Sequence, residues 1–262
     1  MIKPQLKGFW QQIPSTTVSE ILCHSHFDFV CLDTEHGVFN EETIFNCIQT
    51  ISLSGKKVFI RVTEANKTFV RHYLDAGVDG LIFSTMENYE YIYTNLTMTT
   101  SPTDDLIFDL NSETAYSKNV IKQCKFPNNN GKRGYGLTRD NFWGEKPRKS
   151  DPLLIAQIES VKGVGQLSSF SFDFDYFLIG PYDLSSDLGI PGDFESSIYK
   201  QQIHEIKRII PPEKLGYHIV KDIAHQIGDL NDCGILAFSM DTLMLINGIK
   251  EIENIVAIDS IK

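Results

Sequence analysis

Residues 27–37 read FDFVCLDTEHG, and this stretch decides the fold. Its apolar run Asp28–Leu32 has the length and composition of a buried strand, and the polar turn after it leads into Glu41–Ser52, which has the residue spacing of an amphipathic helix. Asn40 is placed to cap that helix and Gly55 to end it. The sequence therefore predicts one strand–turn–helix unit here.

The same pattern recurs along the whole chain. The predicted strands are Gly8–Gln11, Asp28–Leu32, Lys57–Val62, Gly80–Phe83, Leu153–Gln157, Tyr176–Ile179, Leu215–His218 and Ile235–Phe238. The predicted helices are Ser15–His24, Glu41–Ser52, Lys67–Asp75, Tyr116–Gln123, Gly163–Ser168, Phe194–Ile209, Asp222–Leu230 and Asp241–Ile258. Alternating apolar strands and helices are typical of a parallel sheet, and 262 residues is close to the length of one α/β barrel. We expect a single (β/α)8-barrel domain over residues 1–262.

Two segments interrupt this rhythm. Residues 91–113 contain Thr and Asn runs, Pro102 and an acidic pair, so we expect an insertion or long loop there. Residues 125–143, rich in Gly, Asn and Arg, predict a second long loop, of the kind that often carries function.

The composition restricts the function classes. A net charge of -10 argues against nucleic-acid binding, which needs a cationic face. We expect no signal peptide, because no apolar stretch follows the first lysines, and no membrane span. The cysteines, Cys23, Cys31, Cys47, Cys124 and Cys233, are odd in number and widely spaced, which predicts reduced thiols and not a zinc site or a disulfide framework. The protein is expected in the cytoplasm.

Polar residues gather where the predicted strands end. In an α/β barrel these carboxyl ends form the active site. The residues at these positions are Asp33, Glu35, His36, Arg61, Gln157, Glu159, Asp183, His218, Ser239 and Asp241. Each carboxylate alone also fits a helix cap, but their joint occurrence favours an active site on one rim of the barrel.

Glu159 and Asp183 follow neighbouring strands and are candidate ligands for a hard divalent cation. Mg²⁺ or Mn²⁺ suits such a pair, and the free coordination positions would accept a bidentate 2-oxo acid. The alternative is that both carboxylates are helix N-caps, and Asp183 in particular fits that role. These residues alone leave the two interpretations equally open.

His36 and Arg61 are the candidate base and cation. Asp33 is close enough in sequence to orient His36 or tune its pKa. Arg61 is placed to bind a substrate carboxylate or an enolate oxygen, although an ion pair lining the barrel is the alternative. The strand lysines Lys57 and Lys214 lie at the amino ends of their strands, which disfavours a Schiff-base mechanism.

The sequence resembles the HpcH/HpaI family of pyruvate-dependent class II aldolases. The matching stretches are Phe27–Gly37, Arg71–Gly80, Gly131–Gly136, Ala156–Glu159 and Ile179–Ser185. Asp-x-Glu-His and Gly-Pro-x-Asp-Leu-Ser are specific in combination. The resemblance implies a barrel of the phosphoenolpyruvate/pyruvate-binding type, a small-molecule 2-oxo acid as substrate, and cleavage of a 4-hydroxy-2-oxo (2-oxo-3-deoxy) acid into pyruvate and an aldehyde.

The resemblance also implies roles for individual residues. Glu159 and Asp183 would bind the metal, His36 would be the acid/base supported by Asp33, and Arg61 would stabilise the pyruvate enolate. Gln157, Gly180, Pro181 and Tyr182 would line the substrate. Asp75 would approach the histidine of a neighbouring subunit. The resemblance further implies a homo-oligomer, usually a hexamer, whose C-terminal helix, here Asp241–Ile258, packs on a neighbour.

This chain departs from the family pattern in places. Tyr182 replaces a small residue, and Ser84-Thr85-Met86 replaces Pro-Met-Val, so the pocket for the aldehyde portion is expected to differ. Two alternative functions stay open at this stage. One is an acyl-CoA (malyl- or citryl-type) lyase of the same superfamily, which would need a basic groove for the CoA phosphates. The other is a non-catalytic descendant that binds a metabolite or a partner.

Overall fold

Eight parallel strands close into a barrel in the computed structural model, which describes residues 5–62, 67–87, 118–147, 150–221 and 223–259. Each strand pairs with the next along the chain, and the last pairs with the first, so the prediction of a (β/α)8 barrel is confirmed. The strands are β1 (Leu6–Gln11), β2 (Phe29–Asp33), β3 (Lys57–Val62), β4 (Gly80–Phe83), β5 (Leu153–Ile158), β6 (Tyr176–Ile179), β7 (Leu215–Ile219) and β8 (Ile235–Met240).

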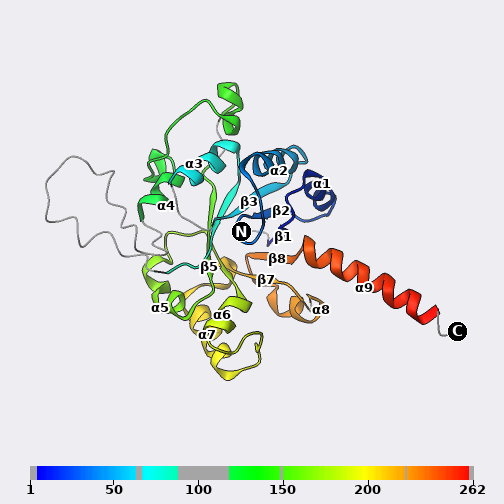
Figure 1. Ribbon diagram of the computed structural model, residues 1–262. Helices are drawn as coiled ribbons and strands as arrows, with labels where there is room; N and C mark the ends of the chain where they lie inside the picture. Colours follow the sequence, from blue (N-terminus) through cyan, green and yellow to red (C-terminus); the bar gives the residue numbers. More distant parts are fainter. Residues whose placement is uncertain (1–4, 63–66, 88–117, 148–149, 222, 260–262) are drawn as a thin grey trace.

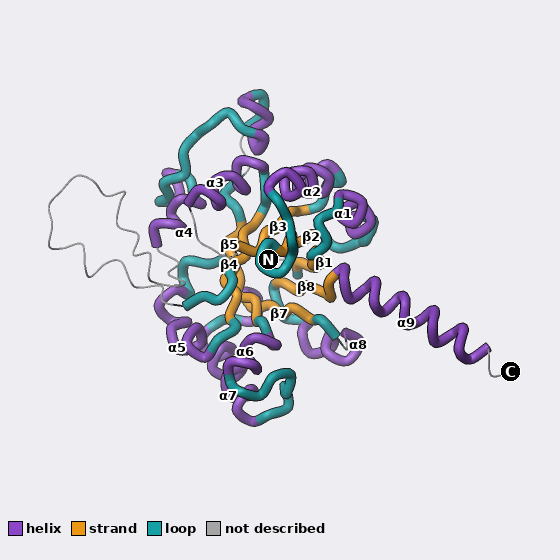
Figure 2. The backbone as a smooth tube through the Cα atoms, viewed as in Figure 1, coloured by secondary structure: helices purple, strands orange, loops and turns teal. Residues whose placement is uncertain are grey.

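Helices surround the barrel (Figures 1 and 2). They are α1 (Thr16–Cys23), α2 (Glu41–Leu53), α3 (Lys67–Ala76), α4 (Lys118–Cys124), α5 (Val161–Phe170), α6 (Pro181–Asp187), α7 (Ser197–Ile209), α8 (Ile223–Gln226) and α9 (Asp241–Asp259). Short 3-10 turns are η1 (Pro127–Asn129), η2 (Arg139–Gly144), η3 (Pro212–Lys214) and η4 (Ile227–Leu230). The predicted insertion at 91–113 lies outside the described residues.

Two helix predictions need correction, and one short helix was missed. The helix predicted from Phe194 begins at Ser197, because Asp193 accepts a hydrogen bond from the Ser196 backbone N–H in a turn that precedes it. The helix predicted over 222–230 divides into α8 and the 3-10 turn η4. The short helix α6 was not predicted at all; it begins at Pro181, a residue well suited to the first helical position.

The capping residues predicted for α2 are confirmed. The Asn40 side chain accepts a hydrogen bond from the Thr43 backbone N–H at 2.8 Å and caps α2. Gly55 and Gly77 have φ angles of 82° and 94°, a left-handed conformation that suits glycine after a helix.

Successive side chains of each strand point alternately into the barrel interior and toward the surrounding helices, which gives two apolar layers. The same alternation sets the direction of the polar side chains at the strand ends. In β2, Val30 and Leu32 belong to the outer layer between strands and helices, whereas Phe29 and Cys31 fill the barrel interior. Successive side chains of a strand point to opposite faces, so Asp33, two residues after Cys31, also points inward. By the same rule Arg61 follows Phe59, and Gln157 follows Ile155. The carboxyl ends of the strands therefore direct polar groups into the mouth of the barrel.

Two further sequence expectations can be compared with the described residues. All five cysteines are free and buried, as predicted for reduced thiols. Among the described helices, none has both the length and the apolar character needed to cross a membrane.

Asp241 shows how the barrel closes between its first and last strands. It follows β8, is 3% exposed, and accepts hydrogen bonds from the backbone N–H groups of Gln12 and Ile13, both at 2.9 Å, and from Thr242 at 2.8 Å. Its carboxylate therefore fastens the segment after β1 to the start of α9.

We predict that Asp241→Ala lowers the free energy of unfolding by about 2–4 kcal/mol, because it leaves two partly buried backbone N–H groups without their acceptor. Urea denaturation measures this change. Asp232→Ala, at an exposed position, is the control and should shift the value by less than about 0.5 kcal/mol. Equal effects of the two substitutions would contradict this role of Asp241.

Candidate active site

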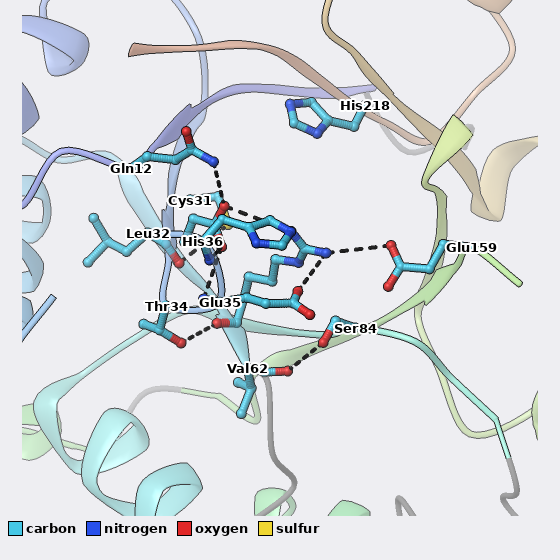
Figure 3. Close-up of polar contacts among 12 residues, drawn as sticks. Gln12, Cys31, Leu32, Thr34, Glu35, His36, Val62, Ser84, Glu159 and His218 are labelled. Atoms are coloured by element: carbon cyan, nitrogen blue, oxygen red, sulfur yellow. Dashed lines mark hydrogen bonds and ion pairs between the residues drawn. The ribbon is translucent and has the colours of Figure 1, made fainter. Parts of the chain in front are cut away.

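Arg61 lies at the centre of the polar cluster in the barrel mouth. Its side chain is 6% exposed, and its Nη2 atom lies 2.6 Å from Glu35 Oε2 and 3.5 Å from Glu159 Oε2. Its Nη1 atom lies 3.8 Å from Asp33 Oδ2, on the neighbouring strand at the paired register position. Burial alone would lower the pKa of Arg61, but the carboxylates around it raise it, so the guanidinium stays charged. Figure 3 shows Glu35 and Glu159 reaching this point from different strands.

Asp33 holds the turn after β2 in place. Its Oδ1 accepts hydrogen bonds from the backbone N–H groups of Glu35 and His36 at 3.1 and 3.2 Å, and its Oδ2 accepts one from Gln12 Nε2 at 3.1 Å. Burial raises the pKa of Asp33, but Arg61 and these hydrogen bonds outweigh burial and lower it. Asp33 is therefore ionised. It binds the backbone N–H of His36 and not the imidazole, which differs from the expected support of the ring.

Glu159 is a buried carboxylate that is only partly satisfied. It is 4% exposed, and its Oε1 accepts hydrogen bonds from Thr85 N–H at 2.6 Å and Thr85 Oγ1 at 2.8 Å. Its Oε2 faces Arg61 but has no hydrogen-bond partner among the described residues. Burial raises the pKa of Glu159; Arg61 and Thr85 oppose this rise, and the nearby Asp183 adds to it. The Oε2 atom of Glu159 is therefore a suitable ligand for a cation.

Asp183 lies in the first turn of α6 and not at its cap. Gly180 is the N-cap residue and Pro181 follows it, so the alternative interpretation of Asp183 as an N-cap is wrong. The Asp183 side chain lines the same cavity as Glu159. The pair therefore faces one space, as a two-carboxylate cation site requires.

Gly180 allows Glu159 to occupy its position. A Cβ atom on Gly180 would lie 2.7 Å from Glu159 Oε2 and 3.1 Å from Gln157 Nε2. Gln157 is 3% exposed, and its Oε1 has no hydrogen-bond partner within the described part of the chain. Gly180 and Gln157 thus lie directly behind the carboxylate. Tyr182 is 37% exposed, and its ring packs against Phe194 at 5.2 Å between centroids.

A cavity of about 250 Å³ opens in front of these groups. It is lined by Glu35, His36, Arg61, Thr85, Glu87, Glu159, Ser160, Asp183 and Asp187. Of the residues predicted from the sequence, His36, Arg61, Glu159 and Asp183 are brought together here. Asp33 and Gln157 support this wall from behind.

Asp75 lies elsewhere in this chain. It is near the end of α3, with a side chain 41% exposed and 3.8 Å from Arg133 Nη2. It does not line the cavity, and its predicted approach to a neighbouring subunit stays a prediction.

Thr85, Glu87 and Asp187 line the cavity but were not predicted from the sequence as site residues. Thr85 and Glu87 follow β4, and Asp187 comes one helical turn after Asp183, so their positions after strands were the available signal.

His218, in β7, stacks on Trp10 with ring centroids 4.5 Å apart, and its Nε2 lies 3.1 Å from the Ser239 carbonyl oxygen. Burial lowers the pKa of His218 to about 4, so this imidazole is neutral at physiological pH.

The donor set fits a divalent cation. Glu159 Oε2 is a buried oxygen without a hydrogen-bond partner in the described structure, and Asp183 adds a second carboxylate beside it. No group of three or more His, Cys, Asp or Glu side chains arranged for a metal occurs among the described residues. The arrangement is therefore that of an open site with two protein ligands, which leaves positions for substrate oxygens.

The fold and the site together define a class: a (β/α)8 barrel with carboxylates, an imidazole and a guanidinium around a cavity at the carboxyl ends of its strands. Residues 7–208 match the family model described as HpcH/HpaI aldolase/citrate lyase. The chain therefore belongs to the HpcH/HpaI aldolase/citrate lyase family, and the resemblance noted in the sequence is confirmed. Aldolases and citrate lyases are both carbon–carbon lyases.

Individual relatives are distant. The chain is 25% identical over 263 residues to the hydroxypyruvate/pyruvate aldolase of Roseobacter denitrificans, with 94% of this chain and 91% of that protein aligned. It is 24% identical over 194 residues to the 4-hydroxy-2-oxovalerate aldolase of Rhodococcus jostii, with 71% and 65% aligned. The chain spans slightly less than two thirds of the length of several curated relatives that it matches.

The fold has solved counterparts. An HpcH/HpaI aldolase/citrate lyase family protein from Burkholderia cenocepacia J2315 superposes with a TM-score of 0.76 at 20% identity, over 97% of this chain and 95% of that one. At this identity the likeness is one of fold.

We predict that Glu159→Gln raises the free energy of unfolding at pH 8 in the presence of a chelator. Because the pKa of Glu159 is raised in the folded protein, the ionised carboxylate lowers the free energy of unfolding at pH values above the ordinary glutamate pKa. Glutamine removes this charge and keeps an oxygen that accepts the hydrogen bond from Thr85. The gain should shrink as the pH falls toward about 4, where the carboxyl is protonated in both states.

Urea denaturation at pH 8 and pH 4 measures this difference. Glu213→Gln, at an exposed position, is the matched control and should show no pH-dependent gain. A Glu159→Gln variant that is less stable than the wild type at pH 8 would contradict the prediction.

Proposed function

We propose that this protein is a class II aldolase that reversibly cleaves a 4-hydroxy-2-oxo acid into pyruvate and an aldehyde with the help of Mg²⁺ or Mn²⁺. The observation that carries the proposal is the shared cavity of Glu159 and Asp183 beside the buried guanidinium of Arg61. The names of the relatives and of the family support the reaction class.

Glu159 and Asp183 would hold the cation, and the bound cation would supply electrostatic stabilisation of negative charge on the 2-oxo acid. Arg61 offers a second positive charge to the same region. Burial of the Glu159 carboxylate is costly unless a cation is near, and Asp183, which is exposed, adds a second carboxylate to the same cavity, so the pair and the guanidinium are complementary parts of one site.

The chain's own groups account for the proton and charge movements. His36 lines the cavity and would remove the proton from the substrate 4-hydroxyl group. The C3–C4 bond then breaks, the aldehyde forms at C4, and the electron pair passes to C3 and the 2-oxo group as the enolate of pyruvate. Arg61 would stabilise this enolate, Gln157 would orient the oxo acid, and return of the proton from His36 to C3 would complete pyruvate.

The acyl-CoA lyase alternative has less support. A CoA thioester carries phosphates that need cationic partners. Among the residues lining the cavity, the guanidinium of Arg61 is already paired with Glu35 and Glu159. The non-catalytic alternative is also less favoured, because the predicted acid, base and cation do meet at one cavity.

The proposal is tested by pyruvate release from 4-hydroxy-2-oxopentanoate and longer 4-hydroxy-2-oxo acids. We expect release with Mn²⁺ or Mg²⁺, loss of release with a chelator, and a fall in kcat/KM on the order of 100-fold in Asp183→Asn, as when a charge-stabilising group is removed. Glu205→Gln, on the exposed surface of α7, should keep the wild-type rate.

Pyruvate release that neither the chelator nor Asp183→Asn affects would contradict the metal mechanism. Cleavage of malyl-CoA in place of the hydroxy-oxo acids would favour the acyl-CoA lyase.

We further propose that the protein is a homo-oligomer in which α9 packs on a second copy. The start of α9 contacts the barrel at β1 and β8, and the rest projects away from it (Figure 1). Its apolar side chains are exposed by 44–64%, and they are Leu245, Ile246, Ile249, Ile252, Ile255 and Val256. An exposed apolar stripe of this length marks a protein interface. The five reduced cysteines favour the cytoplasm as the compartment.

We predict that Ile252→Asp lowers the oligomeric state, since a charge would be buried in the apolar interface. Light scattering coupled to gel filtration measures the mass. Asn254→Asp introduces the same charge on the opposite side of α9 and should leave the mass unchanged. A wild-type protein that elutes as a monomer would contradict the proposal.

A further inference from the structure

The cavity wall is rich in negative charge. Five carboxylates line it, and they are Glu35, Glu87, Glu159, Asp183 and Asp187. The basic side chains on this wall are the imidazole of His36, which is the proposed proton acceptor, and the guanidinium of Arg61, which is buried and already faces Glu35, Glu159 and Asp33. A substrate that enters the cavity therefore meets a strongly acidic surface.

Nearby basic groups do little to balance these carboxylates. Lys162 lies 3.4 Å from Glu87 and is half exposed at the rim, so its charge is screened and already paired. His218 is held neutral by burial. Even with a divalent cation bound, the carboxylates outnumber the positive charges, and the carboxylate of a 2-oxo acid adds one more negative charge.

The chain segments that continue from β3 and β4 bring no basic side chain to this balance. Residues 63–66 and 88–117 follow the carboxyl ends of these strands and contain Glu64, Glu90, Asp104, Asp105, Asp109 and Glu113. They contain no Lys, Arg or His. Whatever positions those residues take, they cannot supply a positive side chain.

Glu87 and Asp187 stand apart from the groups with a role in the proposed chemistry. Glu87 follows β4, whereas Asp187 ends α6 and accepts a hydrogen bond from the Val161 backbone N–H at 2.8 Å. Among the described residues, the ion pairs of Arg61 are with Asp33, Glu35 and Glu159 and not with these two. Glu87 also pairs with Lys162, and Asp187 is exposed, so these two carboxylates lie at the rim of the cavity, where the part of the substrate that extends beyond the 2-oxo acid would meet them.

We infer that the aldehyde partner of this enzyme is an uncharged, hydroxylated aldehyde, and that Glu87 and Asp187 select against aldehydes with a carboxylate or phosphate. The inference rests on the proposed aldolase function and deepens it. Like charges brought together in a partly enclosed site repel, and carboxylate oxygens accept hydrogen bonds from substrate hydroxyl groups. The geometry thus favours polyol chains and disfavours anionic ones.

Equilibrium binding tests this selection without turnover. Isothermal titration calorimetry at pH 8 with saturating Mn²⁺ compares 6-hydroxy-2-oxohexanoate with 2-oxoadipate, which have equal chain length but a neutral and an anionic end. We expect the neutral acid to bind at least tenfold more tightly. In the double variant Glu87→Gln/Asp187→Asn the ratio should fall to about threefold or less.

Glu195→Gln, on the exposed surface, is the control and should keep the wild-type ratio. Equal affinities of the two acids for the wild-type protein, or a ratio that the double variant leaves unchanged, would overturn the inference while pyruvate release could still support the aldolase function. Failure of both acids to bind would overturn the inference and the oxo-acid site together.

Discussion

The site depends on one buried guanidinium surrounded by carboxylates. Arg61 is held between Asp33, Glu35 and Glu159, which come from two other strands or the turns after them. Without Arg61, three acidic groups would lie in a poorly solvated barrel mouth with no positive neighbour. With it, Asp33 remains ionised and fixes the turn that carries His36. Charge balance and the position of the candidate base are therefore set by the same contact.

The negative charge of Glu159 is not fully compensated by its neighbours, and this uncompensated charge points to function. Arg61 and Thr85 do not fully offset the burial of this carboxylate, whose pKa stays raised. Gly180 gives it room, and Asp183 places a second negative charge nearby. A site that costs stability in the isolated chain is what a cation-binding centre requires, since the cation supplies the missing charge.

Much of this arrangement could be predicted from the sequence, for physical reasons. The strands were predictable within two residues at each end because both faces of a barrel strand are buried and give continuous apolar runs such as Lys57–Val62. His36, Arg61, Glu159 and Asp183 were predictable as a group because parallel strands end on the same rim. Other features could not be predicted, because they depend on loop conformation and on register between distant strands. They are the contact of Asp33 with backbone N–H groups, the helix α6, and the contributions of Glu87 and Asp187.

A crystal structure with Mn²⁺, read from its anomalous signal, tests most directly whether Glu159 and Asp183 share one ion. We expect a single strong peak within about 2.0–2.3 Å of a carboxylate oxygen from each residue, with the remaining ligands being waters or a soaked 2-oxo acid. A peak bound by only one of the two carboxylates, or no peak in the cavity at saturating Mn²⁺, would contradict the shared site and with it the metal-assisted aldol cleavage.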